Sequence, residues 1–169
     1  MNDTPLGSLT DEHLPGDEVA AATDAIVARL GGGRFAVALS SVAEVGRAPG
    51  ITRVPGLPTW LAGVANWRGR ILPVLDIRGL LGADSEPLDH RARLLVLAEG
   101  SIVVGMLVDA VEGTTMLGSD VAAFPPVSAP TGSGLLSGQV PRDDGPIAVL
   151  DVAAVLRLRE GLPRGRRTA

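Results

Sequence analysis

Cysteine is absent from the 169 residues, and aromatic side chains make up only 2%. Without cysteine, the chain can hold neither a disulfide nor a thiolate metal site. Because aromatic residues are so scarce, the core must be built mainly from Val, Leu, Ile and Ala, and a core rich in β-branched side chains favours β-sheet. Acidic residues outnumber basic ones, giving a net charge of -4, which argues against a nucleic-acid-binding surface.

Long apolar runs are also missing. No run approaches the ~20 residues that a membrane-spanning helix needs. The first residues show neither the basic region nor the apolar segment of a signal peptide. The sequence therefore predicts a cytoplasmic protein that does not insert directly into the membrane.

Histidine is too sparse to indicate catalysis or metal binding. The two histidines, His13 and His90, lie in polar stretches and not beside an apolar strand end. This placement suggests no Ser-His-Asp or Cys-His arrangement. A metal site needs several convergent His, Cys or carboxylate ligands, and no such set can be assembled. We therefore expect no catalytic residue, no metal and no cofactor.

The residues that are present indicate a compact chain of short elements. Hydrophobic residues make up 46%, and 22 glycines and 13 prolines punctuate them, so turns must be frequent. Residues 1–23 are acidic and polar, and we expect a disordered N-terminal tail. Residues 160–169 are basic, and we expect them to be mobile. The folded domain is expected at residues 24–159.

Apolar runs separated by turn residues predict a mainly β structure. The predicted strands are residues 25–30, 34–39, 61–65, 71–75, 93–98, 102–109, 111–117, 135–140 and 147–150. Ser40 or Ser41 can cap a short turn at 42–45, and residues 83–92 form a polar linker. Asp76 and Asp151 follow strands and can cap short helices at 77–81 and 152–159.

The chain contains an internal repeat with a shift of 75 residues. Strand, turn, strand, aspartate and short helix recur in the same order, with Leu61 and Asp76 falling on Leu136 and Asp151. A capping aspartate in register with both strands favours duplication over chance agreement. Two similar β-rich units, each closed into a small barrel, would leave no sheet edge exposed.

The turn after the 61–65 strand carries an unusual pair of side chains. Asn66 and Gly69 suit a hairpin turn, but turning does not require Trp67 and Arg68. The simple interpretation is a packed tryptophan and an exposed turn arginine. The alternative is partner contact, because Trp and Arg are enriched at the energetic centres of interfaces.

Two other functions remain open from the residues alone. Asp76, Asp109 and Asp151 stand at strand ends, so a small β-barrel hydrolase or transferase could use such carboxylates for acid–base chemistry. Capping is the simpler role for Asp76 and Asp151. An oligonucleotide-binding barrel would need a basic face with several stacking aromatic residues, which this composition does not provide.

Several motifs together resemble one known family. They are FAV at 35–37, VxEV at 42–45, VPG at 54–56, NxRGR at 66–70, LPVLDIR at 72–78 and VGMLVDAV at 104–111. This combination resembles the signature of CheW-type chemotaxis coupling proteins over residues 24–158. One departure is Trp67, which stands where the family usually has Leu.

The resemblance implies a fold and a function. The fold would be two SH3-like five-stranded β-barrel subdomains that share a core, at about 34–82 and 93–140, with the first and last strands able to cross between them. The function would be a non-enzymatic adaptor that links the cytoplasmic tip of chemoreceptors to the regulatory domain of a CheA-type histidine kinase, with other CheW-like domains in receptor arrays as further partners. The expected partner-binding residues are Val42, Gly63, Asn66, Trp67 and Arg68.

Overall fold

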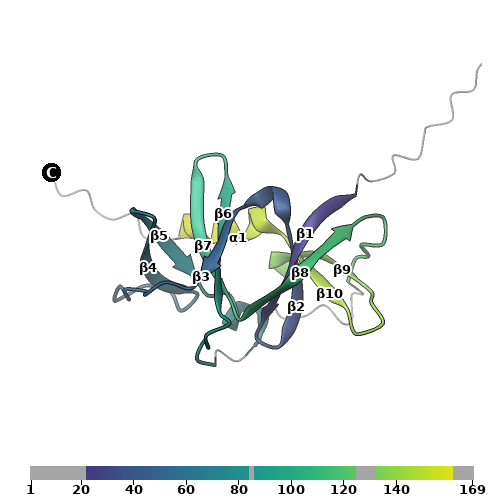
Figure 1. Cartoon of the computed structure of the whole chain (residues 1–169), viewed down its shortest axis with the longest axis horizontal. Coiled ribbons are helices and arrows are strands. Elements are labelled where there is room, and N and C mark those ends of the chain that lie inside the picture. The colour runs from purple at the N-terminus through teal and green to yellow at the C-terminus, as the bar shows by residue number, and fades with distance from the viewer. Residues whose placement is uncertain (1–21, 84–85, 125–131, 162–169) are drawn as a thin grey trace, which may run out of the picture.

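The computed structural model describes residues 22–83, 86–124 and 132–161, and its strands form two five-stranded sheets. Sheet A has the order β8-β1-β2-β10-β9, and sheet B has the order β3-β6-β7-β5-β4. The strands of sheet A are β1 (Thr23–Leu30), β2 (Gly33–Ala38), β8 (Ala110–Leu117), β9 (Leu136–Val140) and β10 (Ile147–Leu150). Those of sheet B are β3 (Val42–Arg47), β4 (Leu61–Trp67), β5 (Arg70–Leu75), β6 (Arg93–Glu99) and β7 (Ile102–Val108). The expected mainly β fold with two five-stranded units is confirmed, and Figure 1 shows the two sheets side by side.

The two sheets do not follow the expected residue ranges 34–82 and 93–140. β2 belongs to sheet A with β8, β9 and β10, whereas β6 and β7 belong to sheet B. Strands are thus exchanged between the two expected units, and two parallel strand pairs, β5 with β7 and β10 with β2, produce this exchange. Such pairs join strands that are distant in sequence, so local apolar patterns do not reveal them.

The repeat is confirmed by matching backbone contacts in the two units. In sheet B the amide of Asp76 donates to the carbonyl of Trp60 at 2.8 Å. In sheet A the amide of Asp151 donates to Leu135 at the same 2.8 Å, and these residues lie 75 positions further along the chain. Val64 and Gln139, which also lie 75 positions apart, each form an isolated bridge to a residue outside the strands, Thr52 and Ala122 respectively.

The main core lies where the two units meet. Alternate residues of β7 (Val104, Met106 and Val108) are fully buried in it. Helix α1 (Val152–Arg157) adds Val155 and other apolar side chains to the same cluster. As expected, Asp151 caps this helix, because its Oδ1 accepts the Ala154 amide at 3.0 Å.

Some local predictions are corrected. Residues 42–47 form strand β3 and not a capped turn, and the preceding 3₁₀ turn is η1 (Leu39–Ser41). The element after Asp76 is only a 3₁₀ turn, η2 (Gly79–Leu81), and Asp76 binds Arg78 instead of capping a helix. The final helix ends early and continues as η4 (Leu158–Gly161).

Two sequence predictions, the N-terminal tail at residues 1–23 and the C-terminal tail at residues 160–169, lie mostly outside the described residues. Within the described part of the chain, no helix is long and apolar enough to cross a membrane.

Candidate functional site

Arg68 occupies a backbone conformation that an arginine seldom adopts. It forms the β4–β5 turn with Gly69, and the φ angles of the two residues are 50° and 81°. Asn66 fixes the turn, because its Oδ1 accepts the amide of Gly69 at 2.9 Å. Glycine or asparagine suits such left-handed positions, whereas other side chains meet a steric penalty there. Turn formation therefore does not account for the arginine.

Glu44 on β3 orients this turn. Its Oε2 lies 2.7 Å from Nε of Arg68 and accepts the Nε1–H of Trp67 at 3.0 Å. β3 and β4 are the two outer strands of sheet B, so these contacts connect its edges. The side chain of Arg68 nevertheless remains 75% exposed, which leaves most of its guanidinium accessible. An exposed ion pair of this kind adds only ~1 kcal/mol or less to stability.

Sequence analysis missed Glu44 because it placed residues 42–45 in a turn. In β3 the side chains alternate between half-buried and exposed positions. Glu44 is the only charged residue among the three half-buried positions, which are Val42, Glu44 and Gly46. A charged residue on the less exposed face of a strand needs a partner. The residues VAEVGR do not themselves alternate between polar and apolar types, so this face of β3 could not be recognised from the sequence.

The side chain of Trp67 packs against β3 as a wall of sheet B and does not project from the tip of the turn. It is the last residue of β4, and its ring lies against Gly46 of β3. A Cβ atom at position 46 would fall 2.2 Å from the ring atom Cη2, so this close packing requires glycine. The indole contributes to the apolar cluster inside sheet B.

Beside this wall is a small hollow, here called the Trp67 cleft, with a volume of about 200 Å³. Its floor is apolar and its rim is charged. The lining residues are Ala43, Glu44, Trp67, Arg68, Arg70, Leu72, Val96, Ala98 and Val103. All five strands of sheet B and the β4–β5 turn therefore contribute to a single surface feature that carries both apolar and cationic groups.

The structure brings together only some of the predicted site residues. Asn66, Trp67 and Arg68 share one hairpin, and Trp67 and Arg68 line one cleft. Gly63 is buried under Thr52, and Val42 packs against the main core. Neither Gly63 nor Val42 is among the residues that line the Trp67 cleft.

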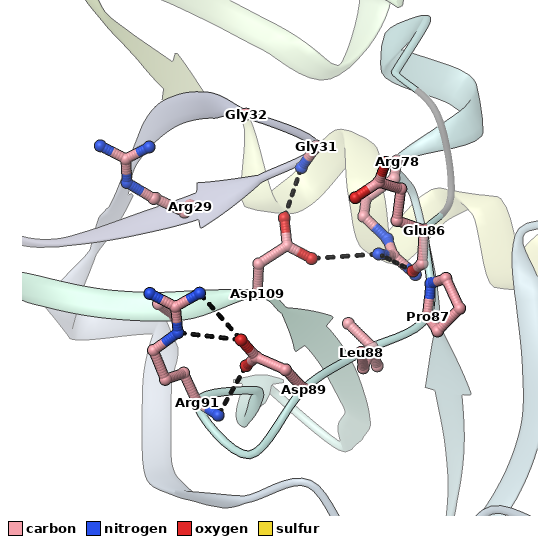
Figure 2. Close-up of a pocket in the computed structure, with 11 residues that line it drawn as sticks. Arg29, Gly31, Gly32, Arg78, Glu86, Pro87, Leu88, Asp89, Arg91 and Asp109 are labelled. Carbon is pink, nitrogen blue, oxygen red and sulfur yellow. Dashed lines mark hydrogen bonds and ion pairs between the residues drawn. The ribbon is translucent and has the colours of Figure 1, made fainter.

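A larger polar hollow of about 500 Å³ lies between the units and surrounds a buried ion-pair network. Arg78 is only 5% exposed, and its Nη1 lies 3.0 Å from Oδ1 of Asp109. Figure 2 shows Asp109 between Arg78 and the Gly31 amide, which donates to its Oδ2 at 2.6 Å. A single carboxylate thus connects the 3₁₀ turn of sheet B to the β1–β2 hairpin of sheet A.

The charges in this network favour a structural role for its carboxylates over a role in acid–base catalysis. Burial alone would raise the pKa of Asp76, but the hydrogen bonds and charge of Arg78 outweigh it and hold the pKa of Asp76 below its ordinary value. A general acid at neutral pH needs a raised pKa. Asp76 is ionised and bonded to Arg78 at 2.7 and 2.9 Å, so it acts as a structural anion.

Comparison with known proteins gives consistent similarities. The family model for the CheW-like domain matches residues 24–160. Protein PilI of Pseudomonas aeruginosa is 39% identical over 103 residues, which cover 60% of this chain and 58% of PilI. Chemotaxis protein CheW of Bacillus subtilis is 30% identical over 92 residues, 54% of this chain and 59% of that protein. The chain thus spans less than two thirds of these curated relatives.

A solved structure supports the fold. The scaffolding protein TtCheW of Thermoanaerobacter tengcongensis superimposes with a TM-score of 0.68 at 24% identity, covering 76% of this chain and 88% of that one. The family match covers nearly all of the described residues. The chain therefore belongs to the CheW-like domain family of chemotaxis and chemosensory systems, whose CheW members are non-enzymatic adaptors and scaffolds.

Proposed function

We propose that this chain joins the cytoplasmic tip of a chemoreceptor to the regulatory domain of a CheA-type histidine kinase, and that Arg68 contacts one of these partners. Such an adaptor would lie at the inner face of the membrane through its receptor, within arrays that also contain other CheW-like domains. Membership in the CheW-like family supports the adaptor role. The observation that carries the site is Arg68 itself, an exposed cation in a left-handed turn.

Three physical arguments support Arg68 as a contact residue. First, backbone strain at an exposed residue persists only when something else selects the side chain, and function is a common cause. Second, Glu44 engages Nε, and no other residue that the structure describes binds the two terminal amino groups of the guanidinium. Third, the planar arrangement of those donors matches a carboxylate or a pair of carbonyl oxygens.

Replacing Arg68 should weaken binding without unfolding the chain. Arg68→Ala is expected to weaken partner binding by about 1 kcal/mol or more, which is roughly fivefold in Kd. Arg68→Glu should have a larger effect, because repulsion is added to the lost contact. The measurement is a titration of each variant with the cognate receptor tip and, separately, with the kinase regulatory domain.

The matched control is Arg157→Glu, which makes the same charge change at an exposed position of α1. This variant should bind both partners like wild type. Thermal melts of all the variants should agree, since exposed substitutions usually change stability by less than about 0.5 kcal/mol. If Arg68→Glu binds both partners like wild type, Arg68 is not a contact residue; if it unfolds, Arg68 is a structural residue.

A further inference from the structure

We infer that the Trp67 cleft receives one large apolar side chain of the partner, and that a neighbouring carboxylate of the same partner pairs with Arg68. The inference rests on the proposed function and adds the chemistry that the partner segment must carry. It concerns the part of sheet B where all five strands, β3 to β7, and the β4–β5 turn contribute lining residues.

The size and the floor of the cleft suit an apolar anchor. Leu72 and Val96 are buried beneath it, and Val103 is half-buried at its side. The volume is about 200 Å³, and an apolar cavity of roughly 150 Å³ is enough to hold a benzene ring. One Leu, Met or Phe side chain would therefore fill it, and removing this apolar surface from water would favour binding.

The wall of the cleft is fixed before a partner arrives. The indole of Trp67 is held by its hydrogen bond to Glu44, at 3.0 Å, and by its contact with Gly46, two residues along β3. A side chain that is already ordered loses little conformational freedom on binding. Tryptophan is also the residue type most enriched among the anchors of interfaces.

The charge of the rim determines what lies next to the anchor. Arg68 and Arg70 both line the cleft and are exposed, whereas Glu44 is the only acidic residue in its lining. Glu44 already faces Nε of Arg68 at 2.7 Å. The rim therefore carries a net positive charge, and a carboxylate beside the apolar residue is its complement.

The position in the sheet A unit that is equivalent to Trp67 does not combine an aromatic wall with a positively charged rim. Arg142 stands 75 residues after Trp67, and its Nη1 lies 2.9 Å from Oδ2 of Asp120. A partner's apolar side chain placed there would meet an ion pair in place of an indole ring, and desolvating that pair would be costly. The proposed anchor site is thus specific to the unit that carries Arg68.

The test is to fill the cleft from two different strands and leave Arg68 in place. Ala43→Phe on β3 and Ala98→Leu on β6 both place new atoms at lining positions. Each should weaken binding by roughly tenfold for the partner that uses the cleft. The control is Val45→Phe, an exposed position of β3 that does not line the cleft, and it should bind like wild type.

The probes are the purified receptor tip and the purified kinase regulatory domain, titrated one at a time, with a melt of each variant. Unchanged binding by Ala43→Phe would overturn the cleft inference and leave the adaptor function intact. Weakening by Val45→Phe equal to that of Ala43→Phe would overturn it too, since bulk anywhere on β3 would then suffice. If wild type binds neither partner, the proposed function itself fails. Ala43 is exposed, so its variant decides the outcome even if Ala98→Leu does not fold.

Discussion

Arg78→Ala is expected to lower the free energy of unfolding by about 3 kcal/mol or more, the usual effect of removing one partner of a buried ion pair. Arg78 donates to both oxygens of Asp76, to Asp109 and to the carbonyl of Glu86. Its loss would leave two largely buried carboxylates without their cation and would detach the segment that begins at residue 86. Urea unfolding followed by circular dichroism measures the change.

The control for Arg78 is Arg91→Ala. Arg91 lines the same hollow, but its side chain is 70% exposed and its ion pair with Asp89 lies in solvent. Its removal should change stability by less than about 0.5 kcal/mol. Equal effects of the two substitutions would contradict the assignment of Arg78 as the residue that connects the two units.

The same network predicts a specific response to acid. The pKa of Asp76 is depressed in the folded state, so its contribution to stability is present above its unfolded pKa of about 3.9 and is lost as the pH falls through the lower folded value. The free energy of unfolding should be measured between pH 7 and pH 2. Below about pH 4 it should fall less steeply for Arg78→Ala than for wild type. Parallel curves would show that Arg78 does not depress the pKa of Asp76.

Gly63→Ala is expected to destabilise the fold by about 3 kcal/mol, because it combines backbone strain with overpacking. The φ angle of Gly63 is 145°, and a Cβ atom there would lie 2.2 Å from the carbonyl oxygen of Thr52. That oxygen accepts the Val64 amide at 2.9 Å, so it cannot move without breaking the bridge. A thermal or urea melt gives the result.

Gly113→Ala separates the effect of backbone strain from the effect of the steric collision. Gly113 has a similar φ of 153°, but a Cβ atom there would meet nothing within 4 Å. Its substitution should therefore show only the backbone strain, about 1–2 kcal/mol. If both glycine variants lose the same stability, the collision with Thr52 contributes nothing.

Local sequence signals predicted the local structure well. The adjacent strands β6 and β7 and the Asp151 cap each depend on residues close together in the chain, and each is present. The turn at Asn66–Gly69 was also predicted, although the structure shortens it to two residues and extends β4 through Trp67.

Contacts between distant segments were not predictable in the same way. Glu44 bonds to side chains 23 and 24 residues further on, and Arg78 bonds to Asp109, 31 residues away. An arginine two residues after an aspartate usually indicates an exposed pair, so its burial depends on the second unit. The exchange of strands between sheets, through the parallel β5–β7 and β10–β2 pairs, is likewise a non-local property.

The proposed adaptor role requires that one chain hold two partners at once. Its most direct test is sedimentation of the receptor tip and the kinase regulatory domain, mixed with and without this chain. We predict that the two partners form a joint complex only when the chain is present, and that Arg68→Glu reduces the amount of that complex. If each partner binds the chain but excludes the other, or if the joint complex forms equally well without the chain, the chain is not the adaptor that joins them.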